Sequence, residues 1–263
     1  MSGTIEWCGE DLVDYGLRIG SVQTYDSPGH SGQSVLVPGR LGEAPTVNDY
    51  LDTPNEIREY DAAVYLRNAS NEAVAQKMAE LRSLLMNDGK YYIFRDSYEP
   101  SFYRLAFWYG SFAPQRKGAG NNFRLPLRWS CDPRRFVYGV SPVVMTKSGA
   151  TTAQITASVT GYAVQSTANP VIKVEGGNQA FTLKFGKLSS LADYGEISFA
   201  AFNRTVWFDV DTLSASYDEE GRYNANSEIL DVTGNVYLLA AGTIFTRSNA
   251  SAKITITPRW WVR

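Results

Sequence analysis

The feature that most constrains the fold is a stretch, residues 123–131, in which Phe, Leu, Leu, Trp and Cys occupy every second position and Arg, Pro, Arg and Ser stand between them. Successive side chains of a β-strand point to opposite faces, so this stretch predicts a strand with one buried and one exposed face. A second strand-like stretch, residues 102–112, precedes it, and the loop between them is too long for a tight turn. We therefore expect a projecting hairpin over residues 102–131. Pro126 cannot donate a ladder hydrogen bond, which predicts an edge or a bulge there.

A single amphipathic helix is expected in the chain. Apolar residues from Val74 to Leu85 repeat at the spacing of one helical face, and the opposite face is polar. We expect the helix to begin near Asn71, which can cap it, and to end at about Met86, before Asn87-Asp88-Gly89. Residues 57–66 before the helix and 91–94 after it read as strands.

The remainder of the chain reads as strands and turns, so the expected fold class is mostly β. Aromatic residues make up 13% of the chain, which favours strands. Strand alternation pauses around Cys131-Asp132-Pro133, and we place a domain boundary near residue 137. The predicted first domain, residues 1–136, is barrel-like or sandwich-like with the helix and the hairpin. The predicted second domain, residues 137–263, is a β-sandwich.

The predicted hairpin carries most of the candidate interface residues. The chain as a whole has 25 Lys and Arg against 27 Asp and Glu, which argues against sequence-independent binding of nucleic acid. The hairpin is nevertheless basic and aromatic, which fits an oligonucleotide surface, a defence against unwanted strand pairing or a docking surface. We take it as a candidate partner interface. Its residues are Arg116, Lys117, Arg124, Arg128, Tyr103, Phe107 and Tyr109.

The two cysteines and the N-terminus indicate a protein made in a cytoplasm. Cys8 and Cys131 are far apart and have no metal-ligand spacing, so we interpret them as free thiols. The first residues have neither the basic nor the apolar region of a signal peptide, and no run reaches membrane-spanning length.

Candidate catalytic residues are few, and each has a simpler interpretation. The single histidine, His30, lies in a glycine-rich stretch that lacks a complete nucleophile motif. Asp209 and Asp211, with Asp218 nearby, could act as the paired carboxylates of a cell-wall glycosidase, but the solvated face of a sheet also explains them. We expect no enzyme, cofactor or metal.

A carbohydrate-binding protein is the alternative in the binding class. It would use aromatic residues of the second domain, and tryptophan rings can stack on sugars. The candidates are Trp207, Trp260 and Trp261.

Motifs in a fixed order resemble those of the distal tail proteins of long-tailed bacteriophages. Residues 37–42 contain a similar Pro-Gly-Arg-x-Gly turn, formed by Pro38, Gly39, Arg40 and Gly42. The helix, the strand pair, a Cys-x-Pro junction and an all-β domain that opens with Asn-Pro-Val-Ile at 169–172 follow in order. Leu41, where an acidic residue is frequent, and Thr243, where Asn is expected, depart from the pattern.

The resemblance implies a structural virion protein at the tail tip. Its first domain would close a hexameric ring, and its second domain would be a galectin-like β-sandwich on the outside of that ring. The implied partners are the tail-tube protein above and the tail hub, or tail-associated lysin, below, with a receptor-binding protein as a further partner. DNA would pass through the lumen without specific binding, and assembly would take place in the host bacterial cytoplasm.

Overall fold

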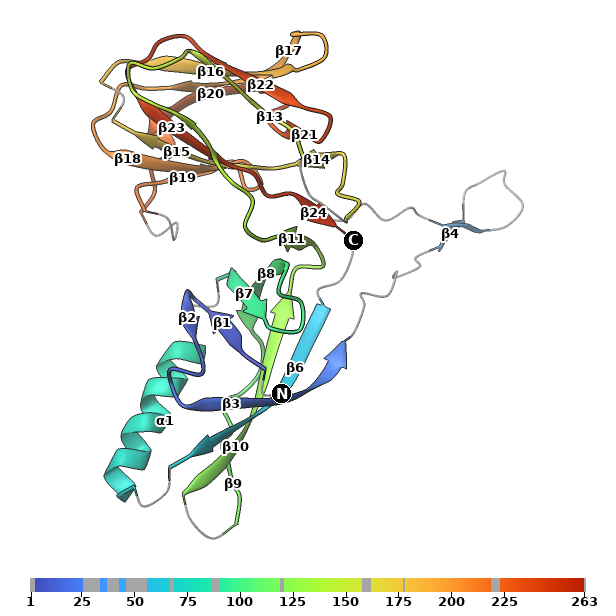
Figure 1. Ribbon diagram of the computed structural model, residues 1–263, viewed down its shortest axis with the longest axis vertical. Coiled ribbons are helices and arrows are strands. Elements are labelled where there is room, and N and C mark those ends of the chain that lie inside the picture. The colour runs from blue at the N-terminus through green and yellow to red at the C-terminus, as the bar shows by residue number, and fades with distance from the viewer. Residues whose placement is uncertain are drawn as a thin grey trace. The chain divides into compact units, whose positions relative to one another are not determined.

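The computed structural model describes residues 3–25, 34–36, 43–45, 56–66, 69–86, 90–118, 121–157, 162–176, 178–218 and 223–262. The chain divides into two units, Met1–Tyr138 and Gly139–Arg263, each described here by itself. The prediction of a mostly β protein with one helix is confirmed, and α1 (Asn71–Leu85) is the only α-helix in the described part of the chain (Figure 1). Pro38, Gly39, Arg40 and Gly42, as well as His30, lie outside the described residues.

The first unit is built on one curled antiparallel sheet with the strand order β2-β1-β7-β8-β10-β6-β3. Two further short strands join it: β9 pairs with β10, and β11 pairs with β8. A separate pair of strands, β4 and β5, forms its own ladder. The strands are β1 (Ile5–Trp7), β2 (Glu10–Asp11), β3 (Leu17–Tyr25), β4 (Ser34–Leu36), β5 (Glu43–Pro45), β6 (Glu56–Tyr65), β7 (Tyr92–Asp96), β8 (Phe102–Trp108), β9 (Gln115–Arg116), β10 (Asn122–Cys131) and β11 (Arg135–Val137).

Helix α1 covers one face of this sheet, which we call the inner face. Leu81 and Leu85 are buried, and the indole Nε1 of Trp7 donates to the carbonyl of Leu84 at 3.1 Å. The helix and the strands thus share one apolar core. Its buried members are Ile5, Trp7, Leu12, Leu17, Ile19, Tyr60, Ala62, Val64, Leu81, Leu85, Phe94, Ala106, Leu125, Leu127, Trp129 and Cys131.

Two local predictions are corrected. Ser70, not Asn71, caps the helix, because its side chain accepts a hydrogen bond from the backbone of Ala73. Pro126 marks neither an edge strand nor a bulge, since β10 pairs with β6 along its length and with β8 at one end. The side of β10 away from β6 pairs with β9 at residues 123–124 and with β8 at residues 129–131. Pro126 lies between these two stretches, where its missing N–H costs no ladder hydrogen bond to either strand.

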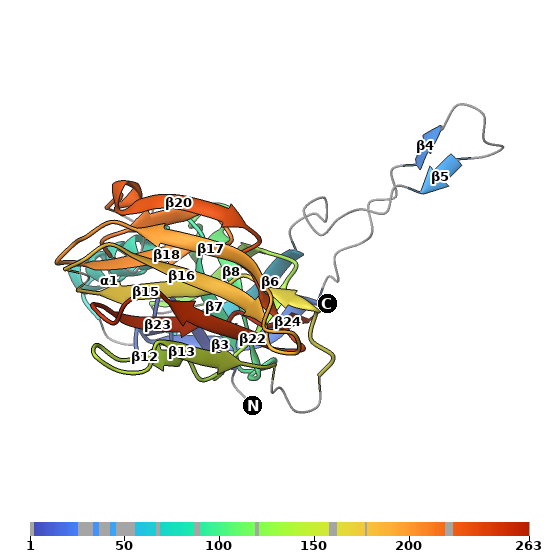
Figure 2. The ribbon, with the colours of Figure 1, turned by 90° about the horizontal axis from the view of Figure 1, so that it is seen from above.

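The second unit holds two five-stranded antiparallel sheets, with orders β12-β23-β15-β18-β19 and β13-β22-β16-β17-β20. Figure 1 shows them as two layers, and Figure 2 shows the second sheet running from β13 at one side to β20 at the other. Strands β14 and β21 form a small separate ladder, and η2 (Asn226–Glu228) is one 3-10 turn.

The strands of the second unit alternate between buried apolar and exposed polar residues, as β16 shows with Phe181, Leu183 and Phe185 buried. Their bounds are β12 (Val143–Met145), β13 (Thr152–Ile155), β14 (Thr167–Ala168), β15 (Val171–Glu175), β16 (Phe181–Lys187), β17 (Asp193–Phe199), β18 (Thr205–Asp209), β19 (Ser214–Ser216), β20 (Ile229–Gly234), β21 (Leu238–Leu239), β22 (Thr243–Arg247), β23 (Lys253–Thr257) and β24 (Trp261–Val262).

Candidate protein-binding face of the first unit

The predicted interface residues on β8 and β10 lie on the face of the sheet opposite the helix. On β10, Leu125, Leu127 and Trp129 are buried in the core, so Arg124 and Arg128 point the other way. We call this second face the outer face.

Both arginines of β10 are held by acids of β6. Arg124 forms a bidentate ion pair with Asp61: Nε lies 2.8 Å from Oδ1, and a second guanidinium nitrogen lies 2.5 Å from Oδ2. These hydrogen bonds and the charge of Asp61 raise the pKa of Arg124. Arg128 Nε lies 2.7 Å from Glu59 Oε1. The sequence marked this strand as basic, but the neighbouring strand offsets its charge.

The three aromatic candidates also lie at the outer face, together with neighbours that the sequence reading missed. Phe107 contacts Tyr109 with ring centroids 6.4 Å apart, and it contacts Tyr91 at 5.2 Å in an edge-to-face arrangement. Tyr103 stacks on Phe136 at 5.2 Å. The guanidinium of Arg128 lies 4.9 Å from the centre of the Tyr109 ring.

Strand β7 supplies the side chains that sequence reasoning overlooked. The sequence predicts a strand over residues 91–94 but assigns none of its side chains to the interface; Phe94 is buried, whereas Ile93 is 48% exposed. Tyr91, just before the strand, is also 48% exposed. The signal was available as alternation, because Tyr91, Ile93 and Arg95 share one face of an extended chain.

Arg116 and Lys117 lie at the end of the β9–β10 hairpin and are exposed. Arg116 donates to the side-chain oxygen of Asn121 at 3.0 Å, and Asn121 donates to the carbonyl of Ala69 at 2.8 Å, close to the start of α1. The hairpin end is therefore attached to the residues that lead into the helix.

At the inner face, a buried ionic network replaces the apolar core towards the start of β6. Glu56 forms ion pairs with two arginines: Oε1 lies 2.6 Å from Arg58 Nε, and Oε2 lies 2.9 Å from a guanidinium nitrogen of Arg104. Glu99 lies 2.9 Å from Arg58, 2.7 Å from Arg104 and 3.5 Å from Arg135. Burial raises the pKa of Glu56. Burial also acts to raise that of Glu99, but the nearby Arg104 and the other arginines lower the pKa of Glu99 overall.

The candidate glycosidase carboxylates of the second unit are engaged in structural contacts. Asp209 forms an ion pair with Arg259, whose second nitrogen lies 3.1 Å from Asp209 Oδ2. Asp211 accepts from the amide of Asn169 at 2.7 Å. The side chain of Asp218 accepts from the backbone of Tyr223 at 3.2 Å. The structure thus uses these carboxylates to hold strand ends and turns together.

The candidate sugar-binding tryptophans differ in accessibility. Trp260 is fully buried, so its ring cannot stack on a ligand. Trp207 and Trp261 are half-buried, and the ammonium of Lys173 lies 5.1 Å from the centre of the Trp207 ring. The structure does not gather the three tryptophans into one exposed platform.

Cys8 and Cys131 are not joined by a disulfide. Cys131 belongs to the core, and burial raises the pKa of its thiol to about 12, so the thiolate is disfavoured. Cys8 lies in the turn between β1 and β2, where Cys8 and Gly9 both have positive φ, as a type I′ hairpin requires.

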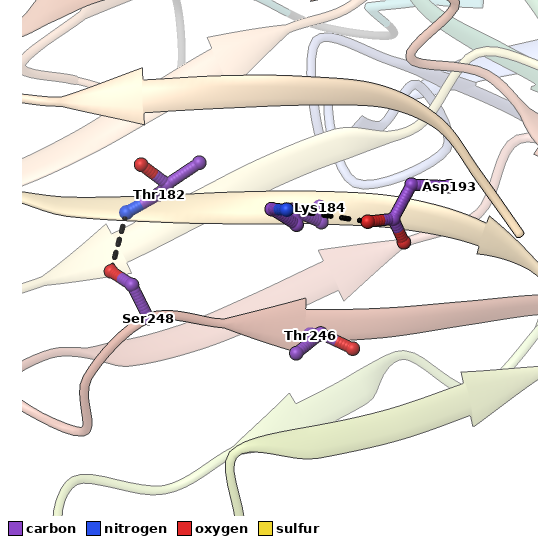
Figure 3. A pocket seen from close by; sticks show the side chains of 5 residues that line it. All are labelled: Thr182, Lys184, Asp193, Thr246 and Ser248. Carbon is purple, nitrogen blue, oxygen red and sulfur yellow. Dashed lines mark hydrogen bonds and ion pairs between the residues drawn. The ribbon is translucent and has the colours of Figure 1, made fainter. Parts of the chain in front are cut away.

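A shallow hollow of about 220 Å³ lies on the sheet of β16, β17 and β22 in the second unit (Figure 3). The residues that line it are polar or charged, and Lys184 Nζ lies 3.3 Å from Asp193 Oδ2. No aromatic ring or buried charge enters it. The lining residues are Thr182, Lys184, Asp193, Thr246 and Ser248.

The described residues contain no group of three or more His, Cys, Asp and Glu side chains that could hold a metal ion. None of their helices has the length and apolar character to cross a membrane.

Thr243 explains one departure from the tail-protein pattern. It is fully buried, and its hydroxyl accepts from the backbone of Leu239 at 2.8 Å and lies 3.0 Å from the hydroxyl of Tyr194. A threonine thus provides a side-chain oxygen that holds the Leu239–Gly242 turn where the family pattern has Asn.

Comparison with known proteins finds similarity at the level of structure alone. No protein-family model and no curated protein sequence matches the chain. Among solved structures, Dit of phage SPP1, described as a paradigm of the hub adsorption apparatus in phages that infect Gram-positive bacteria, aligns over 100% of both chains. The identity is 14% and the TM-score is 0.59. A chain of the phage p2 baseplate in its activated conformation with Sr aligns over 95% of this chain and 98% of its own, with 11% identity and a TM-score of 0.51. The chain therefore has the Dit fold over its full length, which confirms the resemblance seen in the sequence as a likeness of fold.

Proposed function

We propose that the chain is a structural protein of a phage tail tip, of the distal tail kind, and not an enzyme. The observation that carries this proposal is the full-length fold match to SPP1 Dit, which includes both units in order. A match limited to one unit would be weak support, since common β folds serve many functions. Agreement over the entire length of both chains is more specific.

In this proposal the first domain, residues 1–136, closes a hexameric ring. The ring joins the tail-tube protein on one side to the tail hub on the other, and DNA passes through its lumen. The half-exposed aromatic residues of the outer face support an assembly role, because a soluble monomer seldom exposes such a surface. The near balance of 25 Lys and Arg against 27 Asp and Glu supports a lumen that does not hold DNA.

The second domain, residues 137–263, is proposed to be a galectin-like β-sandwich on the outside of the ring. Its two five-stranded sheets with buried inner residues support the sandwich. The virion tail tip is the proposed location. A receptor-binding protein is a candidate partner of this domain.

Size-exclusion chromatography with light scattering tests the proposal on the purified chain, alone and mixed with the tail-tube protein of the same phage. We expect a species of six chains in at least one of the two samples. Only monomers in both samples, over micromolar concentrations, would contradict the proposal.

The structure gives little support to the two alternative functions, a cell-wall glycosidase and a carbohydrate-binding protein, because their candidate residues are engaged or buried. Asp209 is engaged by Arg259, and Trp260 is buried. We expect neither peptidoglycan-degrading activity nor a glycan-array signal that an alanine at Trp207 abolishes.

A further inference from the structure

The outer face of the first unit carries a continuous run of apolar side chains, which we call the aromatic face. Tyr91 and Ile93 are each 48% exposed, and Tyr109 is 44% exposed. Leu105 and Phe107, both half-buried, complete the run. Ile93 belongs to β7, Leu105 and Phe107 belong to β8, and Tyr91 and Tyr109 directly adjoin these two paired strands.

Strand register and ring contacts show that these side chains form one surface. Ile93 lies directly opposite Leu105 in the β7–β8 ladder. Tyr91 contacts Phe107 at 5.2 Å, and Phe107 contacts Tyr109 at 6.4 Å between centroids. Single exposed apolar residues need no explanation, but contiguous large ones mark an interaction site. The aromatic face therefore requires a partner.

The charges that border the aromatic face are paired within the chain. Arg128 pairs with Glu59 and lies over Tyr109, and Arg95 pairs with Glu6 at 2.6 Å. The face thus offers neither an excess of cations for a nucleic acid nor an excess of anions for a basic partner. An apolar centre with depleted net charge is the composition of permanent interfaces between like subunits.

We propose that the aromatic face is the surface through which one copy of the chain binds the next copy in the ring. This inference rests on the proposed ring. A sixfold ring needs a head-to-tail contact, in which two different surfaces of the chain meet. The aromatic face of one copy therefore packs on another surface of its neighbour, and Tyr109 with Arg128 beneath it has the Tyr and Arg composition of an interface hot spot.

The test uses two double variants that add the same charges, with the control positions at least as exposed on average as those of the aromatic face. Ile93→Glu with Tyr109→Glu places two carboxylates on the aromatic face. Val144→Glu with Leu230→Glu places two on the second unit, where the original residues are 47% and 62% exposed. Light scattering gives the assembly state of each, and amide hydrogen exchange shows whether the first unit is still folded. Ile93→Leu with Tyr109→Phe is the conservative form.

The aromatic-face variant should stay folded and require about a hundredfold or higher concentration to assemble, because two hot-spot positions are lost. The control and the conservative form should assemble as the wild type does. If the wild type forms rings and the aromatic-face variant forms them equally well, this inference fails while the ring proposal stands. If the wild type forms no rings even with its tail-tube partner, the ring proposal fails and this inference with it.

Mixing provides a second readout that covers a variant with weakened folding. In a head-to-tail contact, a copy with a defective aromatic face can still receive a wild-type neighbour on its other surface. Ile93→Lys alone, mixed with wild-type chains, should therefore end growing assemblies and shift the population to fewer than six chains. A wild-type ring population that is unchanged at a tenfold excess of the folded variant would overturn the inference.

Discussion

The two units follow the same alternation of side chains but expose different chemistry on their sheets. The outer face of the first unit presents half-exposed Tyr91, Ile93 and Tyr109. In the second unit, the outer side of β16 presents Thr182 and Lys184, and apolar residues such as Leu230 stand next to charged ones such as Asp231. A polar outer face suits a unit surrounded by water, whereas an apolar one suits a unit that is covered in an assembly.

The interiors differ as well, in how each accommodates buried arginine. In the first unit, Arg58 and Arg104 pair with the carboxylates of Glu56 and Glu99. In the second unit, Arg247 is 2% exposed and donates to four backbone carbonyls, and burial lowers its pKa. Those carbonyls belong to Thr146, Gly149, Ala150 and Ala252. The buried network of the first unit therefore depends on acids that titrate, whereas the contacts of Arg247 in the second unit depend on carbonyls that do not.

The largest effect is expected from breaking the ionic network of the first unit. Arg104→Ala leaves Glu56 and Glu99 short of a partner in a buried site, and we expect a loss of about 3–5 kcal/mol in unfolding free energy. Amide hydrogen exchange should show reduced protection in β6 and β8 and unchanged protection in β16 and β22. Arg124→Ala, which breaks a pair that is 42% and 27% exposed, should cost less than about 1 kcal/mol. Equal losses for the two variants would contradict the assignment of the network as buried.

A comparable loss is expected in the second unit when its arginine is removed. Arg247→Met leaves several buried carbonyls without a donor, at a cost of about 3 kcal/mol. Denaturant unfolding measures it, with protection lost in β22 and β13 only. Arg247→Lys keeps the charge without the planar fork and should recover part of the loss. No difference between Met and Lys would show that the carbonyl contacts contribute little.

Low pH should reduce the stability of the first unit without affecting the region around Arg247 in the second unit. The pKa of Glu99 is lowered on folding, so its contribution to stability is present above its ordinary value of 4.5 and is lost as pH falls through its folded pKa. The raised pKa of Glu56 acts in the opposite sense, and its protonation below the folded pKa favours the folded state. We expect Glu99→Gln to flatten or reverse the decline of first-unit protection between pH 6 and 3.5. Protection around Arg247 should not change over this range, and a parallel decline there would argue against the comparison.

The smallest effect concerns the helix, which only the first unit possesses among the described residues. Ser70→Ala removes the side-chain acceptor at the start of α1 and should cost about 1 kcal/mol. Asn71→Ala should be nearly neutral, because Asn71 lies inside the helix. Circular dichroism during urea unfolding measures both. A larger loss of unfolding free energy for Asn71→Ala than for Ser70→Ala would show that Asn71 is the N-cap, as the sequence predicts.

Local structure could be predicted from the sequence, whereas contacts between residues far apart in the sequence could not. The alternation at 123–131 predicted which side chains of β10 are buried, and the helical repeat located α1 to within a residue at each end. The ion pair between Arg124 and Asp61 depends on the register of β6 against β10, which no local pattern specifies. The same holds for Arg247, whose carbonyl partners at 146–150 lie about a hundred residues away.

Electron microscopy of the purified full-length protein tests the central claim most directly. The account predicts class averages with sixfold rotational symmetry, in which the first units form a closed ring and the second units lie on its outside. Particles that are single chains, or rings closed through the second units with the aromatic face exposed to solvent, would contradict it.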